Sequence, residues 1–277
     1  MSEAVAPTAT AHHVLTLWTS SPERARRGDA AGIDRIGVDL ERIGKQVRQA
    51  GLGTWVSPHT LDDLSVVGRQ LERAQLFVRI DPLGPHTEAQ IEAVLERGAR
   101  VVMLPMFAGA EEVDAFIRRL AGRAEPVLLV ERRAAVDAID EIVAVPGVRE
   151  VHVGINDLSL DLGLANRFAV LVSAEVERVA EATLGADLRL GIGGLGSPLD
   201  RSLPIPSDLV YAQHARLGST AALIARGFDR GQQRGAALGT AIAALRRRLD
   251  HWRSGQASAL GRAHAELAAA TTRAGAW

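Results

Sequence analysis

The sequence predicts an α/β fold, a closed (β/α)8 TIM barrel with extra C-terminal helices. The chain has 277 residues, which is long for one ordinary domain but typical of a single barrel of this kind. Strand-like segments alternate with helix-like segments along it, as they do when helices connect the strands of a parallel sheet. An open doubly wound sheet would need fewer strands or a second domain, and no linker-like stretch divides the chain. A closed barrel is therefore the fold that we expect.

The predicted strands are short runs rich in apolar and β-branched residues. They cover residues 14–20, 33–41, 75–81, 100–107, 126–131, 149–157, 188–194 and 208–218. The predicted helices cover residues 21–32, 61–73, 86–98, 109–123, 134–147 and 167–185, a polar helix follows the second strand, and residues 219–228 come after the eighth strand. Ser20 or Ser21 suits the start of the first helix, Thr60 the start of the second, and Gly98 the end of the third.

The last part of the chain has a different composition. It is rich in alanine and amphipathic, and it predicts one or two further helices with an apolar stripe to bury. That stripe can pack on the barrel or on a neighbouring subunit, and the sequence leaves both possibilities open. We therefore divide the chain into a TIM-barrel catalytic domain, residues 1–228, and a C-terminal helical extension, residues 229–277.

Composition excludes several classes of function. A net charge of −1 provides no global field for nucleic acid or an acidic membrane, and the absence of cysteine excludes thiol nucleophiles, thiolate zinc sites and disulfides. Lys45 is the sole lysine and therefore the one side chain able to form a Schiff base, but its polar surroundings disfavour that chemistry. No apolar run reaches the length of a membrane span, and the first residues lack a signal-peptide pattern. We expect a cytoplasmic protein with no nucleic-acid and no membrane partner.

Two predicted strands end in carboxylates, Glu131 in PVLLVE and Asp157 in VHVGIND. A carboxylate at the end of a buried strand is costly unless it has a partner. In a (β/α)8 barrel the carboxyl ends of the strands face the active-site mouth, so neighbouring carboxylates there suit a hard cation such as Mg²⁺ or Mn²⁺. The alternative is that both are solvated loop acids. We favour the metal site.

Four segments, in this order, carry a family resemblance: VRID, LERGARVVMLPM, PVLLVE and VHVGINDLSLDLG. Together they resemble the HpcH/HpaI aldolase and citrate lyase β-subunit family, one of the phosphoenolpyruvate/pyruvate-binding barrels. The resemblance is good over residues 32–163, weaker to residue 228 and absent in the tail. It implies a divalent-metal-dependent carbon–carbon lyase or aldolase that acts through a pyruvate-type enolate on a small 2-oxo acid. It also favours a homo-oligomer.

The resemblance also implies roles for individual residues. Glu131 and Asp157 match the two metal-binding carboxylates, and Arg79 matches an arginine that contacts the enolate oxygen or the carboxylate of the substrate. The predicted substrate-binding residues are Gly154, Ile155, Asn156 and Pro105. The physical logic agrees, because a cation and an arginine at the keto oxygen stabilise the charge of an enolate without lysine, cysteine or an organic cofactor.

One departure from the family pattern concerns proton transfer. Many of its aldolases have a histidine directly after the acidic residue on the second strand, and Arg42 stands at that position here. Asp39, Glu41 and His59 are the remaining candidates for acid–base or positioning roles. A lone loop histidine is more often a surface or capping residue, so the proton-transfer group stays unassigned.

Two other functions stay open. One is a citrate lyase β-like enzyme that cleaves a CoA thioester, for which Arg201 and Arg216 are the obvious basic residues near the last strands. The other is a barrel that has lost lyase activity and serves a binding or specialised biosynthetic role. The glycine-rich segment at residues 191–196 suits a tight turn better than a phosphate site. For His152 and His214, which the prediction places in strands, we expect structural roles.

Overall fold

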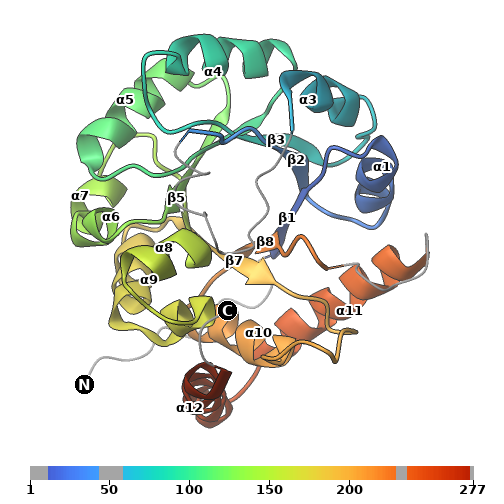
Figure 1. Cartoon of the computed structure of the whole chain (residues 1–277), viewed down its shortest axis with the longest axis vertical. Helices are drawn as coiled ribbons and strands as arrows, with labels where there is room; N and C mark the ends of the chain where they lie inside the picture. Colours follow the sequence, from blue (N-terminus) through green and yellow to red (C-terminus); the bar gives the residue numbers. More distant parts are fainter. Residues whose placement is uncertain (1–11, 44–58, 229–235, 275–277) are drawn as a thin grey trace.

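Eight parallel strands close into a barrel in sequence order, which confirms the predicted fold class (Figure 1). The computed structural model describes residues 12–43, 59–228 and 236–274. The strands are β1 (Val14–Trp18), β2 (Arg35–Asp39), β3 (Gln75–Arg79), β4 (Val101–Leu104), β5 (Glu125–Val130), β6 (Glu150–Val153), β7 (Arg189–Leu195) and β8 (Ala221–Ile224). β8 pairs with β1, so the sheet has no open edge.

The helices form a ring outside the strands. They are α1 (Pro22–Ala30), α3 (Leu61–Gly68), α4 (Thr87–Glu96), α5 (Ala110–Leu120), α6 (Arg133–Asp137), α7 (Ile139–Val143), α8 (Ile155–Asp161), the 3₁₀ helix η1 (Arg167–Val172), α9 (Ala174–Gly185), α10 (Ser207–Arg216), α11 (Ala236–Arg253) and α12 (Ala257–Ala274). The predicted helix ends are present. Ser21 caps α1, Thr60 and Asp63 form a capping box at the start of α3, and Gly98 follows α4 with φ +86°.

The eighth strand was predicted in the wrong place. Residues 207–216 form α10, and β8 is the four-residue segment AALI that follows the turn at Gly218. An apolar run of ten residues fits a buried helix as well as a strand, and here the helix is buried on several sides. His214 therefore lies on a helix and not in a strand.

Two other predicted elements are divided in the structure. β6 ends at Val153, and Asp157 lies in the first turn of α8 instead of at the end of a strand. The long helix predicted for residues 167–185 is a 3₁₀ helix followed by α9, with the break at Ser173, whose hydroxyl caps α9. In both places a new helix begins inside a segment whose apolar pattern continues past that point.

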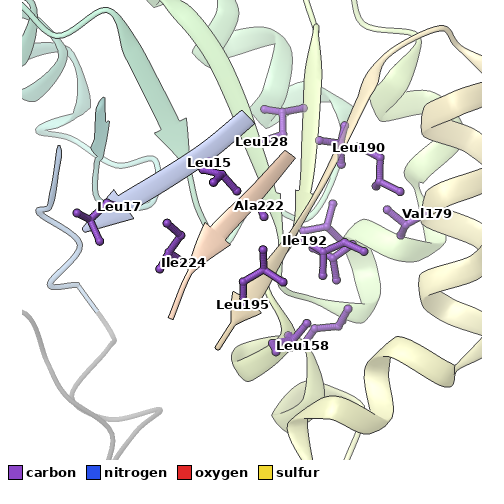
Figure 2. Close-up of a cluster of buried hydrophobic side chains, with 14 of the residues drawn as sticks. Leu15, Leu17, Leu128, Leu158, Val179, Leu190, Ile192, Leu195, Ala222 and Ile224 are labelled. Carbon is purple, nitrogen blue, oxygen red and sulfur yellow. The ribbon is translucent and has the colours of Figure 1, made fainter. Parts of the chain in front are cut away.

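Two apolar layers hold the barrel together. The outward faces of the strands pack against the helices, and Figure 2 shows part of this layer, including Leu15, Leu128, Leu190 and Ile192 of the strands and Val179 of α9. A second cluster fills the interior of the barrel. Its members are Trp18, Phe77, Val101, Met103, Val127, Leu129 and Leu223. Most of these residues lie within their strands, whereas Trp18 ends β1 and Val101 begins β4.

The C-terminal helices pack on the barrel, one of the two possibilities that the sequence left open. α11 contacts α10 and α1 and so fills the last place in the ring, while α12 lies outside it against α10 and η1 (Figure 1). Arg246 of α11 donates hydrogen bonds to the backbone oxygens of His13 and Gly32 and to Asp34. The division into two domains stays a prediction. Among the described residues, no helix combines the length and apolar character that a membrane span requires.

Candidate active site

The carboxyl ends of the strands bring together several residues that the sequence singled out. Asp39 is the last residue of β2, Arg79 is the last residue of β3, and Glu131 follows β5 directly. In a closed parallel barrel these positions surround one mouth. The three side chains are nevertheless buried, with Asp39 1%, Arg79 8% and Glu131 2% exposed. The mouth therefore holds charged groups that are shielded from water.

Arg79 lies at the centre of this cluster. Its Nε and Nη2 atoms donate to the two carboxylate oxygens of Asp39 at 2.9 and 2.8 Å. Nη2 also lies 3.1 Å from Oε2 of Glu41, and Nη1 lies 3.6 Å from Oε1 of Glu131. The bidentate pair with Asp39 fixes the plane of the guanidinium group. The guanidinium group of Arg79 thus connects three carboxylates. One ends β2, one lies two residues after β2, and one directly follows β5.

The charge of Arg79 is stable in this environment. Burial alone lowers the pKa of Arg79, but the carboxylates of Asp39 and Glu41 outweigh that effect and raise it well above its usual value. The indole ring of Trp18, at the end of β1, lies 5.7 Å from the guanidinium carbon and supports it from one face. Arg79 is therefore a fixed, permanently charged donor at the mouth.

A second arginine, Arg226, reaches the same carboxylate, and the sequence analysis did not identify it. It lies two residues after β8, and its Nη2 donates to Oδ2 of Asp39 at 2.9 Å. Because the eighth strand was assigned to the preceding segment, the prediction left this residue in the segment after the last strand. The signal that could have found it is AALIAR, a short apolar run that ends at a charged residue.

Glu131 packs against a glycine at the end of the neighbouring strand. The backbone N–H of Gly154 donates to the oxygen of Val130 at 2.9 Å, which joins the ends of β5 and β6. A Cβ atom on Gly154 would lie 2.5 Å from Cγ of Glu131 and 2.8 Å from its Oε1. The glycine therefore lets the Glu131 side chain lie across the end of β6. This contact is a physical reason for glycine at the first position of the segment GIND.

The segment after Gly154 presents its residues alternately to the interior and to solvent. Ile155 and Asp157 are buried in the first turn of α8, whereas Asn156 is exposed. Because β5 and β6 are adjacent, Asp157 lies on the same side of the mouth as Glu131. Pro105, directly after β4, is buried. The structure therefore places all the predicted substrate-binding and metal-binding residues at the mouth.

His59 contacts the backbone of the site. Its Nδ1 accepts a hydrogen bond from the backbone N–H of Asp39 at 3.0 Å, so the ring hydrogen of the neutral side chain is on Nε2. Arg42 donates through Nη2 to the backbone oxygen of His59 at 2.8 Å. The backbone N–H groups of Arg42 and Ile43 both donate to Asp81. Arg42 stands where the family pattern has a histidine, and here it fixes the position of this loop.

The other predicted features lie apart from the mouth or outside the structure. Lys45 falls outside the described residues. Arg216 ends α10 at the opposite end of the barrel, where it pairs with Glu177 at 2.8 Å, so it is not at the rim. Arg201 is exposed in the segment after β7. Gly194 has φ +91°, which fits the tight-turn interpretation of the glycine-rich segment.

The donor set at the mouth fits a hard divalent cation. Four buried carboxylates and two guanidinium groups lie there. The carboxylates belong to Asp39, Glu41, Glu131 and Asp157, and the guanidinium groups to Arg79 and Arg226. The described residues contain no group of three acidic, histidine or cysteine side chains placed to hold a metal ion. A site of two carboxylates completed by water and substrate is the usual mode of Mg²⁺.

Comparison with known proteins identifies one family. The family model described as HpcH/HpaI aldolase/citrate lyase matches residues 17–183. A curated hydroxypyruvate/pyruvate aldolase from Roseovarius nubinhibens is 31% identical, in an alignment that covers 38% of this chain and 53% of that protein. The chain thus spans about half the length of this curated relative.

Solved structures share the fold. An HpcH/HpaI aldolase from Desulfitobacterium hafniense matches with a TM-score of 0.60 at 19% sequence identity, covering 89% of this chain and 95% of that chain. An HpcH/HpaI aldolase/citrate lyase family protein from Burkholderia cenocepacia matches with a TM-score of 0.62 at 18% identity, covering 88% and 95%. At these identities the likeness establishes the fold alone.

Proposed function

The chain belongs to the HpcH/HpaI aldolase/citrate lyase family, and from this premise we propose that it is a divalent-metal-dependent aldolase. Its substrate would be a 2-oxo acid, from which it forms a pyruvate-type enolate. The observation that supports this best is the buried Arg79, held between Asp39, Glu41 and Glu131 at the barrel mouth. A rigid guanidinium beside several buried carboxylates would provide both a place for a cation and a donor for a developing oxyanion.

In this proposal Glu131 and Asp157 hold the ion. When bound, a divalent cation supplies a Lewis acid that stabilises the negative charge of an enolate. Glu131 directly follows β5, Asp157 lies in the first turn of α8 after the adjacent β6, and the contact between Glu131 and Gly154 limits where the Glu131 side chain can lie. The backbone of Gly154, Ile155 and Asn156, with Pro105 at the end of β4, would border the carboxylate of the substrate.

Arg79 would stabilise the enolate oxygen. Its Nη1 is the guanidinium atom closest to Glu131 and therefore the donor nearest to the proposed ion. Asp39 fixes the orientation of Arg79 before substrate arrives, so little reorganisation is needed when charge develops. Both oxygens of Asp39 accept from guanidinium groups, which makes Asp39 a positioning residue in this proposal.

The aldol reaction requires that one proton be removed and one be added, in either direction. For synthesis, the methyl carbon of pyruvate loses a proton, the enolate carbon bonds to the aldehyde carbon, and the aldehyde oxygen takes up a proton; cleavage is the reverse. Neutral His59 carries its hydrogen on Nε2 and accepts at Nδ1 from Asp39, so it can donate a hydrogen bond but would have to leave Asp39 to exchange a proton. Glu41 is the remaining carboxylate candidate for that exchange.

Calorimetric titration with Mn²⁺, with and without oxalate as a mimic of the pyruvate enolate, tests the proposal. We expect metal binding that oxalate strengthens and that Glu131→Gln abolishes. Glu92→Gln is the matched control, because Glu92 is an exposed carboxylate paired with Arg123 on the outer helices. If the wild-type protein fails to bind Mn²⁺, the proposal is wrong, and a barrel without lyase chemistry becomes the better hypothesis.

The CoA thioester alternative needs a separate titration with CoA. That function would need basic residues at the rim, and Arg216 ends α10, where it pairs with Glu177. Its position gives that alternative little support.

A further inference from the structure

We propose that a buried pair of histidines, His13 and His214, makes the attachment of the C-terminal helices acid-sensitive, so that protonation releases α11 and α12 from the barrel while the strands remain paired. His13 directly precedes β1, and His214 lies on α10, the helix that both α11 and α12 contact (Figure 1). The pair lies apart from the mouth, so this device does not depend on the proposed reaction.

The two rings lie side by side at the junction of three elements. Their centroids are 5.6 Å apart, and the two residues are only 4% and 1% exposed. α11 holds His13 from two sides, because Nη2 of Arg253 lies 3.1 Å from its Nδ1 and Nη1 of Arg246 donates to its backbone oxygen at 2.9 Å. Nδ1 of His214 lies 3.1 Å from the hydroxyl of Ser219, just before β8. The pair thus joins the start of β1 to α10 and α11.

The contacts of the pair require neutral rings. A guanidinium group has only N–H donors, so Nδ1 of His13 accepts from Arg253 and cannot itself carry a proton. The Nε2 atoms of both rings are buried and have no hydrogen-bond partner among the described residues. A proton added to either ring would therefore create a buried positive charge without an acceptor to stabilise it.

The groups around the pair also oppose protonation. Neither ring has a carboxylate partner within the part of the chain that the structure describes, and the ionisable side chains that face the two rings are basic. They are His12, Arg246 and Arg253 of α11, and His152 of β6, while His264 of α12 contacts Gln213 beside His214. The carboxylates of this region already engage those groups: Asp34 pairs with Arg246 and His12, Asp250 with Arg253, and Glu150 with His152. Burial, with these neighbours, lowers the pKa of both histidines.

Opening of α11 would relieve this constraint. When α11 and its two arginines move away, water reaches His13, and an exposed histidine takes up a proton at a pH of about 6.5. The open form then binds protons that the closed form excludes, so its population increases as pH falls below that value. α11 is held by side-chain packing and by these contacts, whereas every strand is hydrogen-bonded to two neighbours in the closed barrel. Release of the helices therefore breaks fewer interactions than unfolding of the barrel.

The expected size of the effect follows from the number of histidines that become exposed. Between pH 7.5 and pH 5.0, the open population should increase about 30-fold for one histidine that is protonated only in the open form, and about 10³-fold for two. His13 contacts α11 directly, so we expect at least the smaller value.

Hydrogen exchange of the full-length protein, measured by mass spectrometry at pH 7.5 and 5.0 and corrected for the intrinsic exchange rate, tests the proposal. At pH 5.0 the amides of α11 and α12 should exchange faster than those of β3–β5, through an opening at least about 30-fold more frequent than at pH 7.5. His13→Gln keeps a neutral acceptor for Arg253 and should remove about 30-fold of that increase. His251→Gln, at an exposed position on α11, is the matched control and should behave like wild type.

His214→Gln provides a second variant, which keeps the test valid if His13→Gln does not fold. It should also weaken the pH response of α11. Equal protection of α11 and of β3–β5 at pH 5.0 would show that acid acts only by unfolding the whole protein, and would overturn the inference. So would an opening of α11 with the same frequency at both pH values, or a full pH response in both variants.

Discussion

The two ends of the barrel interior use buried charge in opposite ways. At the amino-terminal end, the carboxylate of Glu150 lies between two guanidinium groups, that of Arg35 at 2.6 Å and that of Arg189 at 2.8 Å, and it also has a hydrogen bond with Nε2 of His152 at 2.6 Å. At the mouth, the guanidinium of Arg79 is surrounded by carboxylates. An apolar layer of interior side chains separates the two clusters.

The difference lies in the charge balance. At the amino-terminal end, Glu150 and Glu125 face Arg35 and Arg189, so the charges cancel without a ligand. Burial alone would raise the pKa of Glu150, but its hydrogen bond with His152 and the nearby Arg35 reverse that effect and hold it well below its usual value. At the mouth, four carboxylates, those of Asp39, Glu41, Glu131 and Asp157, lie near two guanidinium groups, those of Arg79 and Arg226. The charges at the amino-terminal end are therefore matched within the protein, whereas the mouth is the end at which the proposed cation would add positive charge.

Removing a carboxylate at the mouth should have the largest effect. Asp157→Asn should reduce aldol activity by at least about 10²–10³-fold, the loss that follows removal of one preorganised transition-state contact. It should leave the thermal unfolding temperature of the metal-free protein unchanged or raised, because it removes excess negative charge. Asp161→Asn is the control, since Asp161 is an exposed carboxylate on the same helix. Full activity in Asp157→Asn would contradict the metal assignment.

Removing the carboxylate of Glu150 at the amino-terminal end should instead lower the stability of the protein. Glu150→Gln leaves Arg35 buried without its closest counter-charge and should cost about 3–5 kcal/mol of unfolding free energy. Urea denaturation measures this cost. Glu177→Gln, which breaks an exposed pair with Arg216, should cost less than about 1 kcal/mol. If Glu150→Gln were as stable as wild type, the proposed contrast between the two ends would be wrong.

The smallest predicted effect concerns pH. Burial lowers the pKa of His214 to about 3, and burial, with His214 and Arg253 nearby, lowers that of His13. The unfolded state therefore takes up protons below pH 6.5 that the folded state takes up only at lower pH, so stability falls as pH falls from about 6.5 toward 3.

Urea denaturation at pH 6.0 and 5.0 measures this dependence. Each histidine should contribute about 1.4 kcal/mol per pH unit in this interval. His214→Gln should reduce the slope by that amount, whereas His251→Gln, at an exposed position on α11, is the control. An unchanged slope in His214→Gln would exclude His214 as the source.

The sequence predicted much of the mouth because the strand ends are local features. PVLLVE and VRID each combine a short apolar run with a charged residue at its end, and the structure places Glu131 and Arg79 at the mouth as expected. Asp157 was expected at a strand end and lies instead on the first turn of α8. It still lies at the mouth, because the helix begins immediately after the strand.

Arg226 could not be predicted in the same way. Its assignment depended on the position of the eighth strand, and residues 207–216 form a helix whose apolar pattern also fits a buried strand. Its partner, Asp39, is 187 residues away in the chain. No periodicity within either segment indicates that pairing, because it arises only when β8 closes on β1.

By itself, the sequence determined the fold class, the identity of the charged residues at several strand ends and the absence of thiol chemistry. These properties follow from composition, alternation of elements and local strand signals. The tertiary structure decided which charges meet: Arg79 with three carboxylates, Arg226 with Asp39, and Glu150 with Arg35 at the opposite end. The physical reason is that hydrophobic periodicity is a local property of the chain, whereas charge compensation in a buried cluster depends on contacts between distant segments that closure of the barrel creates.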